Sequence, residues 1–181
     1  MKKSSRTVST TAAGFALLAL SSCALGDSGP DGGSGNDAAP PSEAQGTGLA
    51  DFDPCTFFKP DELTSFGVGT QAEDFTLVSF QPGCSWTGQD LDLVLQKNAD
   101  ETVDSLSKGA WDEFTKIDVA GREAARVVPA GATGQGICNT VVSTGGGVAL
   151  YQLTAAMRDT LADPCGEIEK IANQTASRLP A

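Results

Sequence analysis

Four cysteines constrain how this chain of 181 residues can fold: Cys55, Cys84, Cys138 and Cys165. No two of them have the close spacing, two to four intervening residues, that most four-cysteine zinc sites use, so we expect no zinc site. In an oxidising compartment an even number of cysteines predicts disulfides, here two. Four cysteines permit three pairings, and the sequence leaves all three open. We favour Cys55–Cys84 and Cys138–Cys165, because each bond ties the start of an expected helix to a strand nearby in sequence.

The N-terminal residues indicate the compartment. Basic residues at 2, 3 and 6 precede the apolar run at 12–20, which is the layout of a secretory signal peptide. The run is too short to cross a bilayer as a permanent helix. It leads into Leu20-Ser21-Ser22-Cys23, which resembles the lipobox of bacterial lipoproteins.

This lipobox implies that residues 1–22 are removed and that Cys23 carries a diacylglyceryl group. Two acyl chains are enough for stable anchoring, whereas one is marginal. We therefore expect a protein held by lipid on the extracytoplasmic face of the cell membrane. The alternative is a freely secreted protein in which Cys23 follows the leader by chance.

Charge and composition exclude several classes of function. The chain has 23 acidic residues, 12 basic residues and no histidine. Its net charge of −11, more negative once the basic leader is removed, argues against binding nucleic acid or gripping anionic lipid through charge. Without histidine a Ser-His-Asp or Cys-His site cannot form, and the commonest transition-metal ligand is missing. We expect no catalytic residues, no cofactor and no metal, and hence a protein that is not an enzyme.

The chain divides into three parts. Residues 24–51 are rich in Gly, Pro, Ser, Ala and Asp and contain almost no large apolar side chain. Such a segment buries too little surface to offset the entropy cost of ordering, so we expect the lipidated cysteine and a disordered tether over 23–51. The remaining residues, 52–181, are numerous enough for one globular domain with a hydrophobic core.

Helices are expected at both ends of this domain and in its middle. Asp53-Pro54-Cys55 and Asp163-Pro164-Cys165 each place a good N-cap before a proline suited to the first helical position. Between them, residues 98–114 carry apolar side chains at helical spacing and predict a further helix.

Several other segments are β-rich or alternate between apolar and polar residues. They predict strands at 75–80, from 84 onward, and at 90–95, 122–128, 137–143 and 148–153. The glycine-rich stretches at 131–136 and 145–147 lie between strands and lack the order of a phosphate-binding loop, so we expect turns there. The order of elements predicts an α+β fold, with a mainly antiparallel sheet of about five or six strands packed with helices.

The cysteines and their neighbours also resemble a known family. The resemblance rests on the lipobox, the tether, the two Asp-Pro-Cys sequences, Gly83-Cys84-Ser85-Trp86, and Ile137-Cys138 within an expected strand. Together these features resemble the actinobacterial lipoproteins grouped as domain of unknown function 3558, over about residues 52–179. The resemblance implies an envelope lipoprotein with an α+β domain, and it brings no catalytic residues.

The sequence favours a non-enzymatic domain that binds or senses a small ligand, apolar or derived from the cell wall. Trp111 and Phe114 could wall an apolar pocket against the strands at 91–95 and 148–153, although packing in the core is the favoured role for both. A second hypothesis is an accessory protein that docks on a membrane or secreted protein partner. A third is an envelope hydrolase that uses two carboxylates, which is least favoured because no pair of acidic residues stands out.

Overall fold

The computed structural model describes residues 48–181. The predictions for the signal peptide, for Cys23 and for most of the tether lie outside the described residues. Within 48–181, no helix is both long enough and apolar enough to cross a membrane. The fold includes a few residues that the sequence assigned to the tether: Leu49, in the short 3-10 helix η1 (Leu49–Asp51), is only 2% exposed.

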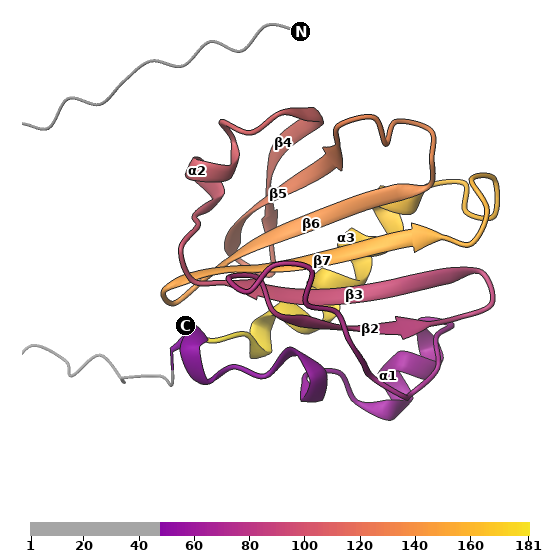
Figure 1. Ribbon diagram of the computed structural model, residues 1–181, viewed down its shortest axis with the longest axis horizontal. Coiled ribbons are helices and arrows are strands. Elements are labelled where there is room, and N and C mark those ends of the chain that lie inside the picture. The colour runs from indigo at the N-terminus through magenta and orange to yellow at the C-terminus, as the bar shows by residue number, and fades with distance from the viewer. Residues whose placement is uncertain (1–47) are drawn as a thin grey trace, which may run out of the picture. The chain divides into compact units, whose positions relative to one another are not determined.

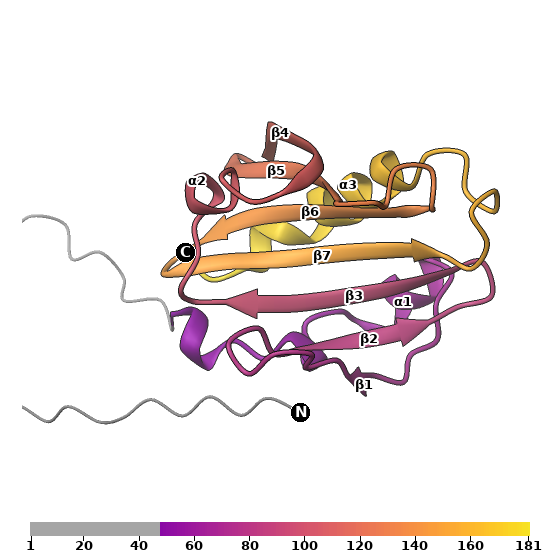
Figure 2. The same ribbon diagram turned by 45° about the horizontal axis from the view of Figure 1, so that its top comes forward.

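Seven strands form one antiparallel sheet in the order β1-β2-β3-β7-β6-β5-β4 (Figures 1 and 2). The strands are β1 (Glu73–Asp74), β2 (Gly83–Thr87), β3 (Leu91–Asn98), β4 (Trp111–Val119), β5 (Arg122–Pro129), β6 (Ile137–Thr144) and β7 (Gly147–Ala155). Consecutive strands pair within β1–β3 and within β4–β7, and β3 pairs with β7 to join the two groups. The antiparallel sheet is confirmed, but it has seven strands where five or six were expected.

Helices flank the sheet, and those at the two Asp-Pro-Cys sequences begin where the sequence indicates. Besides η1, the described residues form η2 (Pro54–Thr56), α1 (Pro60–Ser65), α2 (Val103–Leu106), α3 (Pro164–Thr175) and η3 (Ala176–Arg178). Each Asp-Pro-Cys sequence starts a helix: the Asp53 carboxylate accepts from the Cys55 N–H, and the Asp163 carboxylate from the Gly166 N–H, both at 2.9 Å. These caps satisfy backbone N–H groups that a helix start leaves without a partner.

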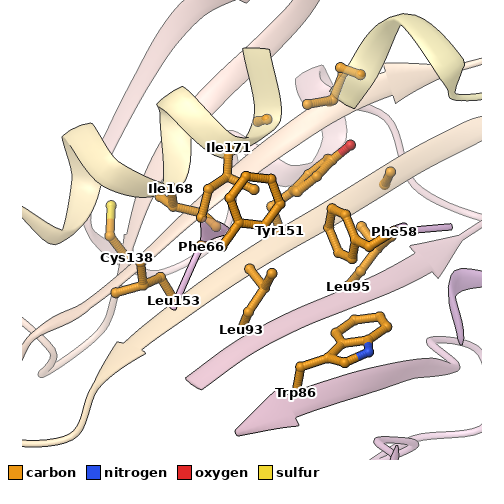
Figure 3. Close-up of a cluster of buried hydrophobic side chains, with 14 of the residues drawn as sticks. Phe58, Phe66, Trp86, Leu93, Leu95, Cys138, Tyr151, Leu153, Ile168 and Ile171 are labelled. Atoms are coloured by element: carbon orange, nitrogen blue, oxygen red, sulfur yellow. The ribbon is translucent and has the colours of Figure 1, made fainter. Parts of the chain in front are cut away.

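The main core lies between α3 and one face of the sheet (Figure 3). Ile168 and Ile171 of α3 pack over Tyr151 of β7, and all three side chains are fully buried. The N-terminal segment extends this core, because Phe58 packs edge-on against Trp86 of β2 with ring centroids 5.1 Å apart. Burial of each such side chain contributes roughly 1.5–3 kcal/mol, so α3 and the N-terminal segment are held mainly by this face.

A smaller apolar cluster lies on the opposite face, where the alternate residues of each strand point. Val103 of α2 packs there with Val127 of β5, Val141 of β6 and Val148 of β7. The connection from β3 to β4 therefore crosses this second face through α2.

The two disulfides have the favoured pairing. Cys55–Cys84 joins η2 to β2, and Cys138–Cys165 joins β6 to the first turn of α3, with Cα atoms 5.1 Å apart in each. Both bonds attach a helix start to the sheet, as the sequence predicts.

The helix predicted over residues 98–114 is wrong for most of its length. Only Val103–Leu106 is helical, and β4 begins at Trp111. The next turn explains the difference: Ala120 and Gly121 have φ values of 53° and 78°, the left-handed pair of a tight two-residue hairpin between β4 and β5. Pairing with β5 along this hairpin outweighs the helical spacing of the apolar residues before it.

The strand predicted at 75–80 is also wrong. Pairing with β2 is limited to Glu73–Asp74, and residues 75–82 form a loop, called the apolar loop below. Within it the Gln81 N–H donates to the Val78 carbonyl at 3.0 Å, which closes a turn. A β-rich composition is not enough for a strand where no neighbouring strand continues the ladder.

Candidate functional site

A cavity of about 510 Å³ lies at the end of the sheet where the β5–β6 loop approaches the N-terminus of α3. Its lining combines apolar and polar groups, and the larger apolar residues in it are Val128, Ala132, Ile137, Leu161 and Pro164. A volume of this size is in the range of small-molecule sites. The cavity is therefore the candidate binding site of the domain.

The Cys138–Cys165 disulfide sets one wall of the cavity. Cys165 itself lines the cavity, and Ile137, next to Cys138, belongs to the same lining. The bond fixes the first turn of α3 over β6. The disulfide that the sequence predicts for stability thus also determines the shape of the candidate site.

A glycine with restricted surroundings fixes the β5–β6 loop next to this wall. Gly136 has a φ of 77°, which L side chains rarely adopt, and a Cβ there would lie 2.8 Å from the Cβ of Ala155. The Ala155 N–H donates to the Gly136 carbonyl at 2.8 Å and closes the loop against β7. Only glycine allows the β5–β6 loop to lie this close to β7 without strain.

The tip of the same loop is held by edge strand β4. A β-bulge between Trp111 and Glu113 displaces Asp112 from the ladder. The Asp112 carboxylate accepts from the Thr133 hydroxyl at 2.8 Å and from the Thr133 N–H at 3.1 Å. The hydrogen bond from the Thr133 side chain is the main reason that the pKa of Asp112 is lowered, with backbone hydrogen bonds adding to it.

Charged groups surround the cavity mouth. Glu113 lines it from β4, and Arg158 and Asp159 line it from the loop between β7 and α3. Glu113 lies 4.0 Å from Arg126, whose Nε also donates to Glu169 of α3 at 2.5 Å. The hydrogen bond to Glu169 is the main reason that the pKa of Arg126 is raised.

Arg158 differs from Arg126 because it is exposed and forms no ion pair within 4.0 Å among residues 48–181. The site therefore combines an apolar floor with one unpaired cation and two carboxylates at its mouth. Such a site suits a small ligand that has both an apolar part and a polar or charged group.

A second cavity, of about 370 Å³, lies where the chain enters the fold. It is lined by residues 50–55 and by parts of the apolar loop, β1, β2 and β3. The Lys97 ammonium here donates to the carbonyls of Leu49, Ala50 and Phe52 at 3.1, 2.7 and 2.6 Å. These bonds use all three donors of Lys97, so this cation fixes the incoming chain and is not free to bind a ligand.

Trp111 and Phe114 do not line either cavity. Both lie on β4 and pack against the smaller apolar cluster, together with Leu106 of α2. The Trp111 indole N–H donates to the Leu106 carbonyl at 2.6 Å, which ties α2 to the start of β4. Their position follows from the strand at 111–119, which places them on the face opposite α3.

The sequence did not reveal the cavity walls. The only sequence feature near the cavity was the glycine-rich stretch at 131–136, which Val128 and Ile137 flank. Leu161 lies farther along the chain, after β6 and β7. Within the described part of the chain, no three His, Cys, Asp or Glu side chains are grouped so as to hold a metal ion.

Comparison with known proteins gives a family but no activity. No curated protein and no solved structure matches the chain. The family model described as "Protein of unknown function (DUF3558)" matches residues 18–178. Because this match spans well over half of the sequence, the chain belongs to the DUF3558 family.

Proposed function

We propose that this chain is an actinobacterial cell-envelope lipoprotein, anchored through Cys23, whose folded domain binds or senses a small envelope-derived ligand. The observation that carries the proposal is the cavity of about 510 Å³ between the β5–β6 loop and the start of α3. Its walls are fixed by a disulfide, by the close approach at Gly136 and by the hydrogen bonds of Asp112. A site held in one shape before binding loses less free energy to ordering when a ligand enters.

The lining indicates the chemistry of the ligand. Val128, Ile137 and Leu161 offer an apolar floor, and Arg158 offers a cation at the mouth. A lipid fragment or a peptidoglycan fragment with an acyl or alkyl part and an anionic group would satisfy both. Glu113 and Asp159 at the same mouth would disfavour a ligand with several negative charges.

A non-enzymatic role fits the hydrogen bonds and ion pairs that the acidic residues around the cavity already form. The Asp112 carboxylate is occupied by the β5–β6 loop, and Glu113 lies beside Arg126. The pKa of Asp112 is lowered, so this carboxyl is a poor proton donor at neutral pH. Together with the absence of histidine from the whole sequence, these contacts favour binding over hydrolysis.

The second candidate is an accessory protein that docks on a membrane or secreted partner. Its supporting observation is the apolar loop, in which Leu77, Val78 and Phe80 are exposed. The two candidates use opposite ends of the sheet, so variants can separate them.

Native mass spectrometry of the membrane-purified protein tests the ligand-binding proposal. The domain should retain a small molecule after incubation with envelope lipid extract or with peptidoglycan fragments. Ala162, an exposed residue on the cavity wall, gives a filling variant, Ala162→Trp, that should abolish retention. The matched control is Ala99→Trp, at an exposed position outside the cavity lining, and it should retain the molecule like the unmodified chain.

Three results would contradict the proposal. A domain that stays empty with both extracts would remove the binding role. Equal retention by Ala162→Trp and Ala99→Trp would show that the ligand binds elsewhere. Turnover of either extract by the purified protein would favour the hydrolase hypothesis instead.

A further inference from the structure

The apolar loop exposes an unusual group of side chains. Leu77, Val78 and Phe80 are 76%, 41% and 57% exposed, and they are three of the four large exposed hydrophobic residues of the described part. The fourth, Met157, lies in the loop between β7 and α3. No charged residue occurs within 75–82, and Ser79 is the one polar residue between Leu77 and Phe80, so the tip of the loop is uncharged and mainly apolar.

Hydrogen bonds hold the base of this loop in place. The Phe75 N–H donates to the Gly83 carbonyl at 2.9 Å. Gln96 of β3 is only 3% exposed, and its side-chain amide donates to the Gln81 carbonyl at 3.1 Å while accepting from the Gln81 side chain at 3.1 Å. The polar groups at the base are paired and at least partly buried, whereas the apolar groups at the tip are exposed. In most loops the apolar side chains are buried and the polar groups are exposed, and here the order is reversed. Such an exposed apolar surface indicates a site that contacts a membrane or another protein.

The loop lies beside the point where the chain enters the fold. Residues 50–55 line the smaller cavity together with Thr76 and Pro82 of the loop. Figures 1 and 2 both show the loop that precedes β2 at the same end of the sheet as the start of η1. The chain therefore enters the fold beside the apolar loop.

We propose that the apolar loop inserts into the lipid surface to which Cys23 is anchored, with Leu77, Val78 and Phe80 below the headgroups. This inference rests on the proposed lipid anchor. About two dozen residues separate Cys23 from Gly48. A flexible tether of that length, as the sequence predicts, spans roughly 27 Å and keeps the bilayer within reach of the loop. Insertion by apolar side chains alone is compatible with the acidic domain, because it needs no basic patch.

Insertion would also orient the candidate binding site. The cavity lies at the far ends of β5 and β7, where β7 finishes at Ala155, whereas the apolar loop precedes the start of β2 at the other end. Strands of this length measure about 25–30 Å. A loop held in the bilayer would therefore place the cavity at the end of the domain far from the membrane, toward ligands in the envelope.

Environment-sensitive labels test the insertion. The proposed anchor occupies Cys23 with lipid, and disulfides occupy the other four cysteines, so a single introduced thiol can be labelled selectively. The full lipidated chain with Leu77→Cys carries an NBD fluorophore and is reconstituted into phosphatidylcholine vesicles. The control carries the same label at Met157→Cys, which is equally exposed at the opposite end of the sheet.

The label at position 77 should shift to the blue and be quenched several-fold by nitroxide-labelled lipid, and the label at 157 should do neither. Adding Phe80→Asp should reduce the quenching at 77, whereas Thr160→Asp should not. If the protein sediments with the vesicles but the labels at 77 and 157 are equally exposed to water, insertion of the loop is overturned and the lipid anchor is not. Protein that does not sediment at all would overturn the anchor as well. A blue shift of the label at position 77 in native membranes but not in pure lipid vesicles would overturn insertion into lipid and would indicate that a protein partner covers the loop.

Discussion

Removal of the Cys138–Cys165 disulfide should loosen the cavity wall in a way that removal of Cys55–Cys84 does not. The bonds span sequence separations of 27 and 29 residues. On the chain-entropy model, each separation of this size stabilises the folded state by about 3.6 kcal/mol at 25 °C. The paired variants, Cys138→Ala with Cys165→Ala and Cys55→Ala with Cys84→Ala, should therefore lose nearly equal free energies of unfolding.

Urea denaturation followed by tryptophan fluorescence measures this loss. With a slope of about 2 kcal/mol per molar urea, the midpoint should fall by about 1.8 M for either pair. Hydrogen exchange then separates the local effects. The amides of Gly166 and Glu167, at the start of α3, should exchange faster only when Cys138–Cys165 is removed, because only that bond attaches this turn to β6.

Two results would refute this reasoning. A loss below about 1 kcal/mol for both pairs would show that the unfolded chain is not the state that the bonds constrain. Faster exchange at the start of α3 in the Cys55/Cys84 variant, to the same extent, would show that the cavity wall depends on global stability and not on the adjacent bond.

Three further predictions follow from the sequence and the structure. Replacing Cys23 by Ala should move the protein from the membrane fraction to the medium, and continued sedimentation of that variant with membranes would rule out the lipid anchor. Gly136→Ala should destabilise the fold by roughly 2–4 kcal/mol in urea denaturation, because the new methyl group meets both a positive φ and a close contact to Ala155. The control, Gly134→Ala, has a similar φ but open surroundings and should cost about 1 kcal/mol. Thr133→Val should raise the pKa of Asp112 toward its ordinary value of 3.8 in an NMR titration, and an unchanged pKa in this variant would refute the assigned hydrogen bond. Because the folded-state pKa is lowered, the contribution of Asp112 to the stability of the fold is present above about pH 4 and is lost as the pH falls through the folded-state pKa.

Local signals in the sequence predicted the parts of the fold that depend on few residues. Asp53 and Asp163 before proline identify two helix starts, because capping requires only the carboxylate and the next three residues. The disulfide pairing followed from the same two helix starts and their neighbouring strands. Leu91, Leu93 and Leu95 alternate as a half-buried strand does, and β3 lies there.

The errors arose where distant partners decide the structure. The apolar spacing that ends at Phe114 fits a helix, but β4 gains a full ladder with β5 through the tight turn at Ala120-Gly121. Residues 75–80 have strand composition, yet no strand pairs with them. The cavity was not predicted because Val128, Ile137 and Leu161 come together only after β5, β6, β7 and the loop before α3 have packed.

Methyl NMR of the full chain with envelope extract tests the central claim most directly, because methyl groups lie at the cavity and at the apolar loop. Ligand binding in the cavity predicts shifts at Val128, Ile137 and Leu161, while Val103 and Val148 in the smaller apolar cluster keep their positions. An extract that leaves the methyl groups of the cavity unchanged, or that shifts only Leu77 and Val78, would contradict a ligand-binding cavity.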